Sequence, residues 1–150
     1  MTAIAGLTDH LGFWLRRVSN HVSHSFARKL AAKDVTVAEW VFLRVLQGTG
    51  PTAPSRLAAE MGMTRGAISK LADRLLAKAL IVRRESGTDG RAQTLGLTAK
   101  GARLVPVLAA LADRNEAECF AHLSARDRDA LRRILEDTTK RLGLDRLPTE

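Results

Sequence analysis

The chain has 150 residues, a length that fits a single domain with a well-developed hydrophobic core. Its formal net charge is +8, with 24 lysines and arginines against 16 acidic residues. A balance this basic favours a polyanionic partner, with nucleic acid ahead of an anionic membrane surface, although positive charge that only solvates the protein remains an alternative. The absence of any apolar run near the roughly 20 residues of a membrane span argues against a membrane protein.

The chain shows no sign of export. Its first residues, MTAIAGLTDHLGFW, lack a basic region followed by an apolar stretch, so no signal peptide is expected. Cys119 is the one cysteine, which excludes an intramolecular disulfide. Both features predict a cytoplasmic protein. Repeats and long linkers are not visible, so residues 1–150 are expected to form one unit.

Two helices are predicted in the N-terminal third. Apolar residues at spacings of three and four predict the first helix over about residues 8–31. The stripe contains Leu7, Leu11, Trp14, Leu15, Val18, Val22, Phe26 and Leu30. The sequence Thr36-Val37-Ala38-Glu39 has the capping-box pattern that opens a helix, and Gly48 and Gly50 are expected to end it.

The next segment predicts a helix-turn-helix. Pro54 is tolerated in a first helical turn, so a short helix is expected from there to about Met61. Gly62 can take the left-handed conformation that closes a helix, and Thr64 can cap the next one, predicted over residues 65–79. Two helices joined by so tight a turn cross steeply. The expected buried face of the second helix consists of Ile68, Leu71, Ala72, Leu75 and Leu76.

A hairpin and two further helices complete the predicted fold. Residues 81–84 and 93–97 have strand character and flank a segment rich in turn formers. A helix capped by Thr98 follows, and Ser124 opens the last helix, which Gly143 ends. The sequence therefore predicts a mainly α protein with a small β-wing: a winged helix-turn-helix lobe with long helices before and after it.

This arrangement predicts contact with duplex DNA. A helix fits the major groove, where its N-terminal residues reach base edges. Arg65 can read a guanine bidentately, Ser69 can contact bases or phosphate, and Lys70 and Arg74 are placed as phosphate clamps. The recognition-helix residues expected at DNA are Thr64, Arg65, Gly66, Ala67, Ser69, Lys70 and Arg74. Arg83, Arg84 and Arg91 are expected to reach DNA from the wing, and Ser55 and Arg56 to contact the backbone from the first helix of the motif.

The residues from Val35 to Gly101 also resemble a known family. The segments TVAEWVFLRVL, PSRLAAEMGMTRGAISKLADRLLAKALIVRR and DGRAQTLGLTAKG are similar to those of the MarR (multiple antibiotic resistance regulator) family of bacterial transcription factors. The resemblance implies a homodimer that binds a palindromic operator, usually as a repressor. It matches Arg91 to the wing arginine of the family and makes Asp89 its helper in shaping the loop.

The resemblance also implies a division of the chain. The winged lobe covers about residues 36–98, and the dimerisation helices cover about 7–31 and 99–143. The long apolar stripes of these outer helices support a dimer independently, because one core cannot easily bury them all. A small-molecule effector site is implied between the two parts, with Trp14, Val18, His21 and Trp40 as its expected lining, although a core position is favoured for both tryptophans.

Other functions are less well supported. His21 and His24 have a spacing that could bind a metal, but no neighbouring ligand completes a site, so neither metal nor cofactor is expected. Cys119 has no second cysteine to resolve it as a redox sensor. No nucleophile elbow, P-loop or carboxylate pair is recognisable, so the protein is not expected to be an enzyme. A winged helix that binds another protein remains the main alternative.

Overall fold

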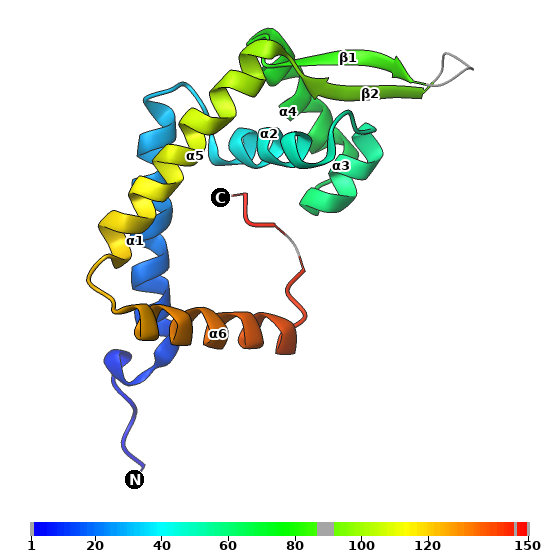
Figure 1. The fold of residues 1–150 in the computed structure, drawn as a ribbon. Helices are drawn as coiled ribbons and strands as arrows, with labels where there is room; N and C mark the ends of the chain where they lie inside the picture. Colours follow the sequence, from blue (N-terminus) through cyan, green and yellow to red (C-terminus); the bar gives the residue numbers. More distant parts are fainter. Residues whose placement is uncertain (1, 87–91, 146, 150) are drawn as a thin grey trace.

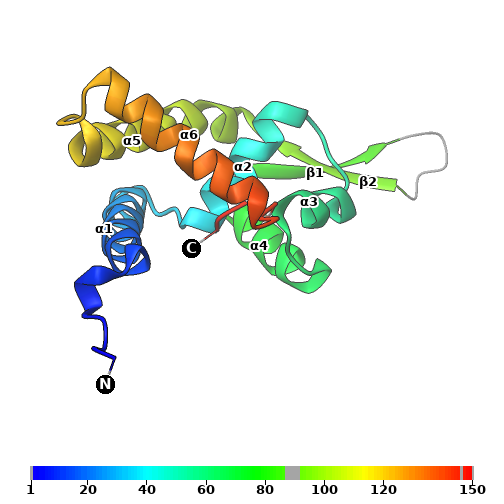
Figure 2. The same cartoon turned by 90° about the horizontal axis from the view of Figure 1, so that it is seen from below.

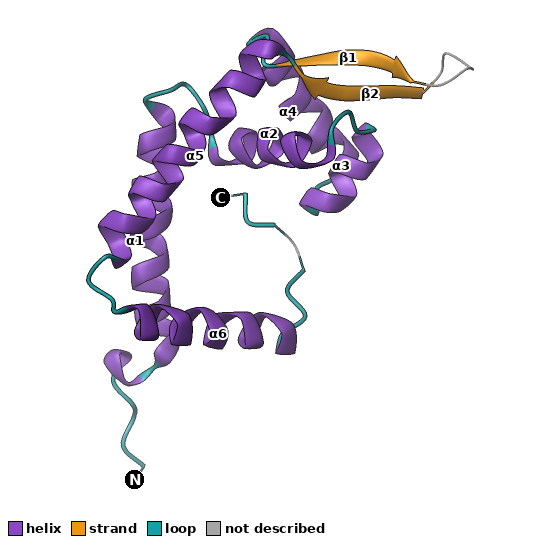
Figure 3. Cartoon of the chain, in the orientation of Figure 1, coloured by secondary structure: helices purple, strands orange, loops and turns teal. Residues whose placement is uncertain are grey.

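The computed structural model describes residues 2–86, 92–145 and 147–149 and is mainly α, with one two-stranded sheet (Figures 1 and 3). This confirms the predicted fold class, a winged helix-turn-helix lobe flanked by terminal helices. The elements in chain order are η1 (Leu7–Asp9), α1 (Leu11–Ala31), α2 (Val37–Thr49), α3 (Pro54–Met61), α4 (Arg65–Ala77), β1 (Ile81–Ser86), β2 (Ala92–Leu97), α5 (Ala99–Phe120) and α6 (Ala125–Arg141).

Four helices begin at the hydroxyl residues that the sequence singles out. Each hydroxyl accepts a hydrogen bond from the backbone N–H three residues further on, at 3.0 to 3.1 Å. Such a bond satisfies one of the donors that every helix start leaves unpaired. The capping residues are Thr36 for α2, Thr64 for α4, Thr98 for α5 and Ser124 for α6.

The first helix starts later than predicted. A 3₁₀ turn precedes it, in which the backbone N–H of Gly6 donates to Asp9 Oδ2 at 2.7 Å. His10 then has extended backbone angles, φ −98° and ψ 128°, which interrupts the helical hydrogen bonds. The apolar spacing of three and four continues across this break, so periodicity alone could not reveal it.

Helix α4 ends two residues before the predicted end. Ala79 takes a left-handed conformation at φ 58°, and the backbone N–H of Leu80 bonds to the carbonyl of Leu75 at 3.0 Å. This turn reverses the chain so that Leu80 and Ile81, both buried, reach the core. The short left-handed turn therefore places β1 directly beside the recognition helix.

The wing is an antiparallel hairpin in which Ile81 pairs with Leu97 and Arg84 with Thr94. It projects away from the helices in both Figure 1 and Figure 2. An isolated bridge ties its base to the loop between α2 and α3, where Thr52 and Leu95 exchange backbone hydrogen bonds at 2.9 Å. The hairpin is thus fixed to the lobe from which the helix-turn-helix also emerges.

The hydrophobic core lies almost entirely in the winged lobe. Its buried side chains are Leu30, Val35, Phe42, Leu43, Leu46, Leu57, Ala58, Met61, Ile68, Leu71, Ala72, Leu75, Leu80, Ile81, Leu95, Val105 and Leu108. The predicted buried face of α4 is confirmed, with Leu76 partly buried against the core. Trp14 is not a core residue of this chain, because 49% of it is exposed.

Helix α6 has no buried residue at all, although it is 17 residues long. No helix within the described residues is long and apolar enough to cross a membrane.

Candidate nucleic-acid interface

The turn before α4 sets the direction of the recognition helix. Gly62 closes α3 in the left-handed conformation, with φ 61° and ψ 33°. The backbone N–H of Met63 returns to the carbonyl of Ala58 at 2.9 Å. Thr64 then caps α4, so Arg65 and Gly66 occupy the first turn of the recognition helix. The local sequence therefore places one arginine and one glycine at the N-terminal end of α4.

Helix α4 divides into a core face and a free face. Arg65, Gly66, Ser69 and Lys70 are exposed, and Ala67 is half-buried. A Cβ atom added at Gly66 would meet nothing within 4 Å, so the surface there is open. This is the face that the sequence predicted to remain outside the core.

A groove of about 500 Å³ runs between α3, α4 and the hairpin. It brings together Ser55, Arg65, Ser69 and Arg83, four of the residues predicted to contact DNA. Its remaining lining is Ala53, Pro54, Ile68, Ala72, Gln93 and Leu95. The groove shows that the start of α3, the recognition helix and one side of the wing form a continuous surface.

Gln93 belongs to this surface, and the sequence analysis missed it. It is exposed on β2, two residues before the buried Leu95. Side chains two apart on a strand point to the same side, so Gln93 extends the side on which Leu95 meets the lobe. That alternation in the sequence QTL could have identified it.

Arg83 and Arg84, two of the predicted wing arginines, are consecutive on β1 and lie on opposite sides of the hairpin. Arg83 lines the groove beside α4 and forms a salt bridge with Asp73 at 3.3 Å. Arg84 instead lines a second cavity with Gln47 and Pro51, at the end of α2. Asp89 and Arg91, also predicted at the wing, lie outside the described residues.

Several predicted DNA contacts are already engaged in ion pairs. Arg56 pairs with Glu60 on α3 at 3.1 Å, and Arg74 pairs with Glu39 of α2 at 3.1 Å. By contrast, neither Arg65 nor Lys70 forms a salt bridge with any residue that the structure describes. These two cations are the part of the face that carries uncompensated charge.

The carboxylate of Glu39 is fully buried beneath α4. It accepts hydrogen bonds from Lys78 Nζ at 2.9 Å and from the Arg74 guanidinium and the Thr36 backbone N–H, each at 3.1 Å. Burial by itself would raise the pKa of Glu39, but Lys78, Thr36 and Arg74 together hold that pKa below its ordinary value. Glu39 is therefore ionised at neutral pH.

Glu39→Gln is expected to make the protein less stable at neutral pH by about 1–3 kcal/mol, because charge-assisted hydrogen bonds are lost. The pKa of Glu39 is lower in the folded chain than its value of 4.5 outside it, so its stabilisation is complete above pH 4.5. It disappears as the pH falls through the folded pKa. Denaturant unfolding of both proteins over a pH series checks this. A stability gap that stays constant down to strongly acidic pH would contradict it.

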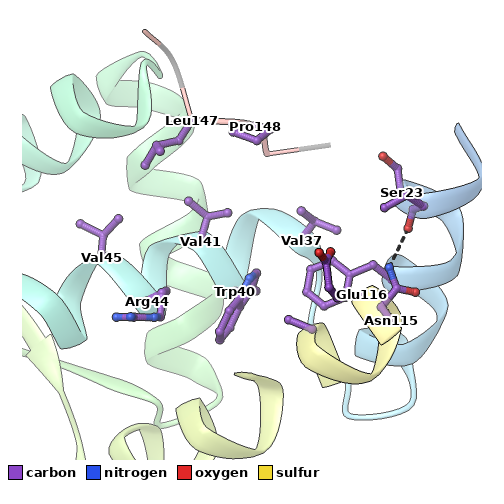
Figure 4. Close-up of a pocket in the computed structure, with 13 residues that line it drawn as sticks. Ser23, Val37, Trp40, Val41, Arg44, Val45, Asn115, Glu116, Leu147 and Pro148 are labelled. Carbon is purple, nitrogen blue, oxygen red and sulfur yellow. Dashed lines mark hydrogen bonds between the residues drawn. The ribbon is translucent and has the colours of Figure 1, made fainter. Parts of the chain in front are cut away.

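A separate cavity, of about 450 Å³, lies between the lobe and the outer helices. In Figure 4 Val37, Val41 and Val45 of α2 line it opposite Leu147 and Pro148 of the C-terminal segment. Val22, Phe26, Ala112, Asn115 and Glu116 belong to its remaining lining, contributed by α1 and α5. The cavity thus occupies the position that the family resemblance implies for an effector.

Of the four residues predicted to line an effector site, only Trp40 lines this cavity, where its ring packs edge-on against Phe26 at 6.4 Å between centroids. Trp14, Val18 and His21 are exposed on the N-terminal part of α1 and do not line it. The stripe of α1 is long enough that its outer turns extend beyond the lobe.

Other sites receive little support from the geometry. Within the described residues, no group of three or more His, Cys, Asp or Glu side chains could hold a metal ion. Cys119 is partly buried near the end of α5 as a free thiol.

The helix-turn-helix, the hairpin and the long outer helices define a winged helix-turn-helix protein, and comparison with known sequences gives its family. A model of the MarR family matches residues 33–92. A protein assigned as the transcriptional regulator of the hcr operon in Thauera aromatica is 30% identical over 131 residues, which cover 87% of this chain and 79% of that protein. The chain belongs to the MarR family.

A second relative is an HTH-type transcriptional repressor of Mycobacterium tuberculosis, 28% identical over 142 residues, which cover 93% of this chain and 99% of the repressor. A mutant MarR of E. coli in complex with operator DNA has a TM-score of 0.74 at 22% identity, covering 85% and 92% of the two chains. BpsR of Bordetella bronchiseptica, whose DNA binding is regulated by 6-hydroxynicotinic acid, has a TM-score of 0.77 at 20% identity, covering 91% and 98%. Both structures share the fold.

Proposed function

We propose that this protein is a sequence-specific double-stranded DNA-binding transcriptional regulator that works as a homodimer on a palindromic operator. The observation that carries the proposal is the free positive charge on the N-terminal half of α4. Arg65 and Lys70 are exposed there without a salt bridge to any described residue, beside a groove that the wing closes. A surface of this charge and shape suits duplex DNA, with α4 in the major groove.

The contacts follow from this placement. Arg65 reads a guanine edge, Gly66 and Ala67 let the backbone approach the bases, and Ser69 contacts a base or a phosphate. Lys70 binds phosphate. Ser55, which lines the same groove, contacts the DNA backbone together with Arg56 and Thr64, and the wing reaches the adjacent minor groove.

The dimer is supported by the outer helices. Leu131, Ile134 and Leu135 of α6 are 39%, 58% and 41% exposed, and Leu11 of α1 is 88% exposed. A 17-residue helix without a buried residue gains little stability from packing within one chain. A second copy that covers residues 7–31 and 99–143 would bury these side chains. Two-fold symmetry would then place two recognition helices roughly 10 base pairs apart.

The protein would act as a repressor that a small molecule releases from its operator. The relative from Mycobacterium tuberculosis is named as a repressor, which supports repression here. The cavity between α2 and the outer helices has the volume of a small-molecule site and a mostly apolar lining with a few polar groups. A ligand bound there would change the placement of the two lobes and so release the operator. The protein would act in the cytoplasm, where its DNA is.

The salt dependence of binding separates this function from a protein-interaction module. Binding through Lys70 and its basic neighbours releases counterions, so the affinity for duplex DNA should fall steeply between two salt concentrations. An affinity for duplex that is immeasurably weak at low salt would contradict the proposed function.

Arg65→Ala is expected to relax base preference at one position of each half-site, at a cost of about 1–3 kcal/mol for the preferred sequence. Lys70→Ala is expected to weaken binding about equally for preferred and scrambled duplexes. Titrations of both variants against both duplexes check this. If Arg65→Ala weakened both duplexes equally, Arg65 would contact phosphate and not a base.

A further inference from the structure

The buried carboxylate of Glu39 connects the start of α2 to the second half of the recognition helix. Glu39 is 0% exposed, and three groups donate to it: the Thr36 backbone, Arg74 and Lys78. Thr36 is the N-cap residue of α2, and Glu39 lies in its first turn. Arg74 lies on α4, and Lys78 is the C-cap residue of that helix. One carboxylate thus holds two helices together.

Lys78 extends this connection to the neighbouring helices. Its ammonium donates to the backbone carbonyl of Asp34, in the loop between α1 and α2, at 2.6 Å. Its own carbonyl accepts from Lys100 Nζ of α5 at 3.0 Å. The C-terminal end of α4 is therefore hydrogen-bonded to α2, to the loop between α1 and α2, and to α5.

One nitrogen of the Arg74 guanidinium, Nη2, points into this cluster, although 52% of the side chain is exposed. Its guanidinium donates to Glu39 Oε1 at 3.1 Å and to Thr36 Oγ1 at 3.2 Å. Arg74 follows Arg65 by nine residues, about two and a half helical turns, so the two side chains leave α4 in opposite directions. The Arg74 guanidinium is also paired with Glu39, a carboxylate that it shares with Lys78, whereas Lys70 has no salt bridge with a described residue.

We infer that Arg74, predicted from the sequence as a phosphate clamp, is a positioning residue that acts through Glu39. With Lys78 it fixes the angle of α4 against α2, so that Arg65 and Ser69 are presented to DNA in one orientation. The inference rests on the proposed function in one respect, that α4 reads DNA.

The salt dependence of binding distinguishes a positioning residue from a clamp. Arg74→Ala and Lys70→Ala are compared with the wild type on two probes: the duplex that the wild type enriches from a random pool, and a mixed random-sequence duplex. Lys70→Ala should reduce the slope of log affinity against log salt by about one on both probes, because one phosphate contact is lost. Arg74→Ala should leave that slope unchanged and weaken binding to the enriched duplex roughly tenfold, as when one base contact is lost.

A double-mutant cycle tests whether Arg74 acts through Glu39. Glu39→Gln, Arg74→Ala and the double variant are measured for affinity and for melting temperature. Residues in one hydrogen-bond network are not additive, so the double variant should lose no more than the worse single variant. Arg74→Gln, which keeps a hydrogen-bond donor, replaces Arg74→Ala if the alanine variant does not fold.

Two results would overturn the inference: a salt slope reduced by about one in Arg74→Ala, or additive losses in the cycle. Neither depends on operator recognition. If the wild type bound preferred and scrambled duplexes equally, the proposed function would fail. The slope on the random-sequence duplex and the melting-temperature cycle would still decide the role of Arg74.

Discussion

Ile134→Asp is expected to separate the proposed dimer into monomers and to weaken operator binding by about 10²-fold or more. Ile134 lies on the free apolar face of α6 and is 58% exposed in the protomer, so the substitution removes no core contact. In the dimer it would bury two carboxylates near a two-fold axis, each at a cost of several kcal/mol. A monomer also loses the avidity of two linked half-sites, which by itself is worth about 10²-fold or more.

Sedimentation velocity and titration with operator duplex measure the two effects, with Ile134→Leu as the conservative control. Helix α6 has no buried residue in the protomer, so the helical circular dichroism of the monomeric variant should also decrease. A variant that stays dimeric with unchanged affinity would show that the α6 face is not the dimer interface.

Gly101→Ala is expected to destabilise the protein by about 3 kcal/mol, the upper part of the range for overpacked sites. Gly101 is buried in the first turn of α5, and a Cβ there would overlap the backbone carbonyl oxygen of Leu80. That carbonyl also accepts from the Thr98 N–H at 3.1 Å, so it cannot move without loss of a hydrogen bond that joins α5 to the wing.

Gly48→Ala is the matched control. Gly48 lies in α2, and a Cβ there would meet nothing within 4 Å. Alanine in an unobstructed helical position stabilises by about 0.5–1 kcal/mol relative to glycine, so this variant should unfold at higher denaturant concentration. Equal and small effects of the two substitutions would contradict the close approach of α5 to Leu80.

The sequence predicted the local features of the fold well because their causes are local. A capping hydroxyl bonds to a backbone group three residues away, so Thr36, Thr64 and Ser124 could be recognised within a few letters. The same holds for Gly62, whose left-handed turn separates α3 from α4. The periodicity of α4 likewise identified its buried face, and with it the residues left free.

What the sequence could not predict depends on partners far along the chain. Arg74 has the same exposed helical pattern as Lys70, and only the fold brings Glu39, 35 residues earlier, beneath it. Gly101 is constrained by a carbonyl 21 residues before it. The position of Trp14 in the apolar stripe of α1 predicts a core residue. In the fold this part of α1 extends beyond the lobe, so Trp14 is exposed.

Selection from a random duplex pool tests the central claim most directly. A dimer with two recognition helices related by two-fold symmetry should enrich a palindrome with half-sites roughly 10 base pairs apart, centre to centre. Arg65→Ala, selected in parallel, should enrich the same palindrome with one position per half-site relaxed. Enrichment of no sequence, or of one without two-fold symmetry, would contradict sequence-specific binding by a homodimer.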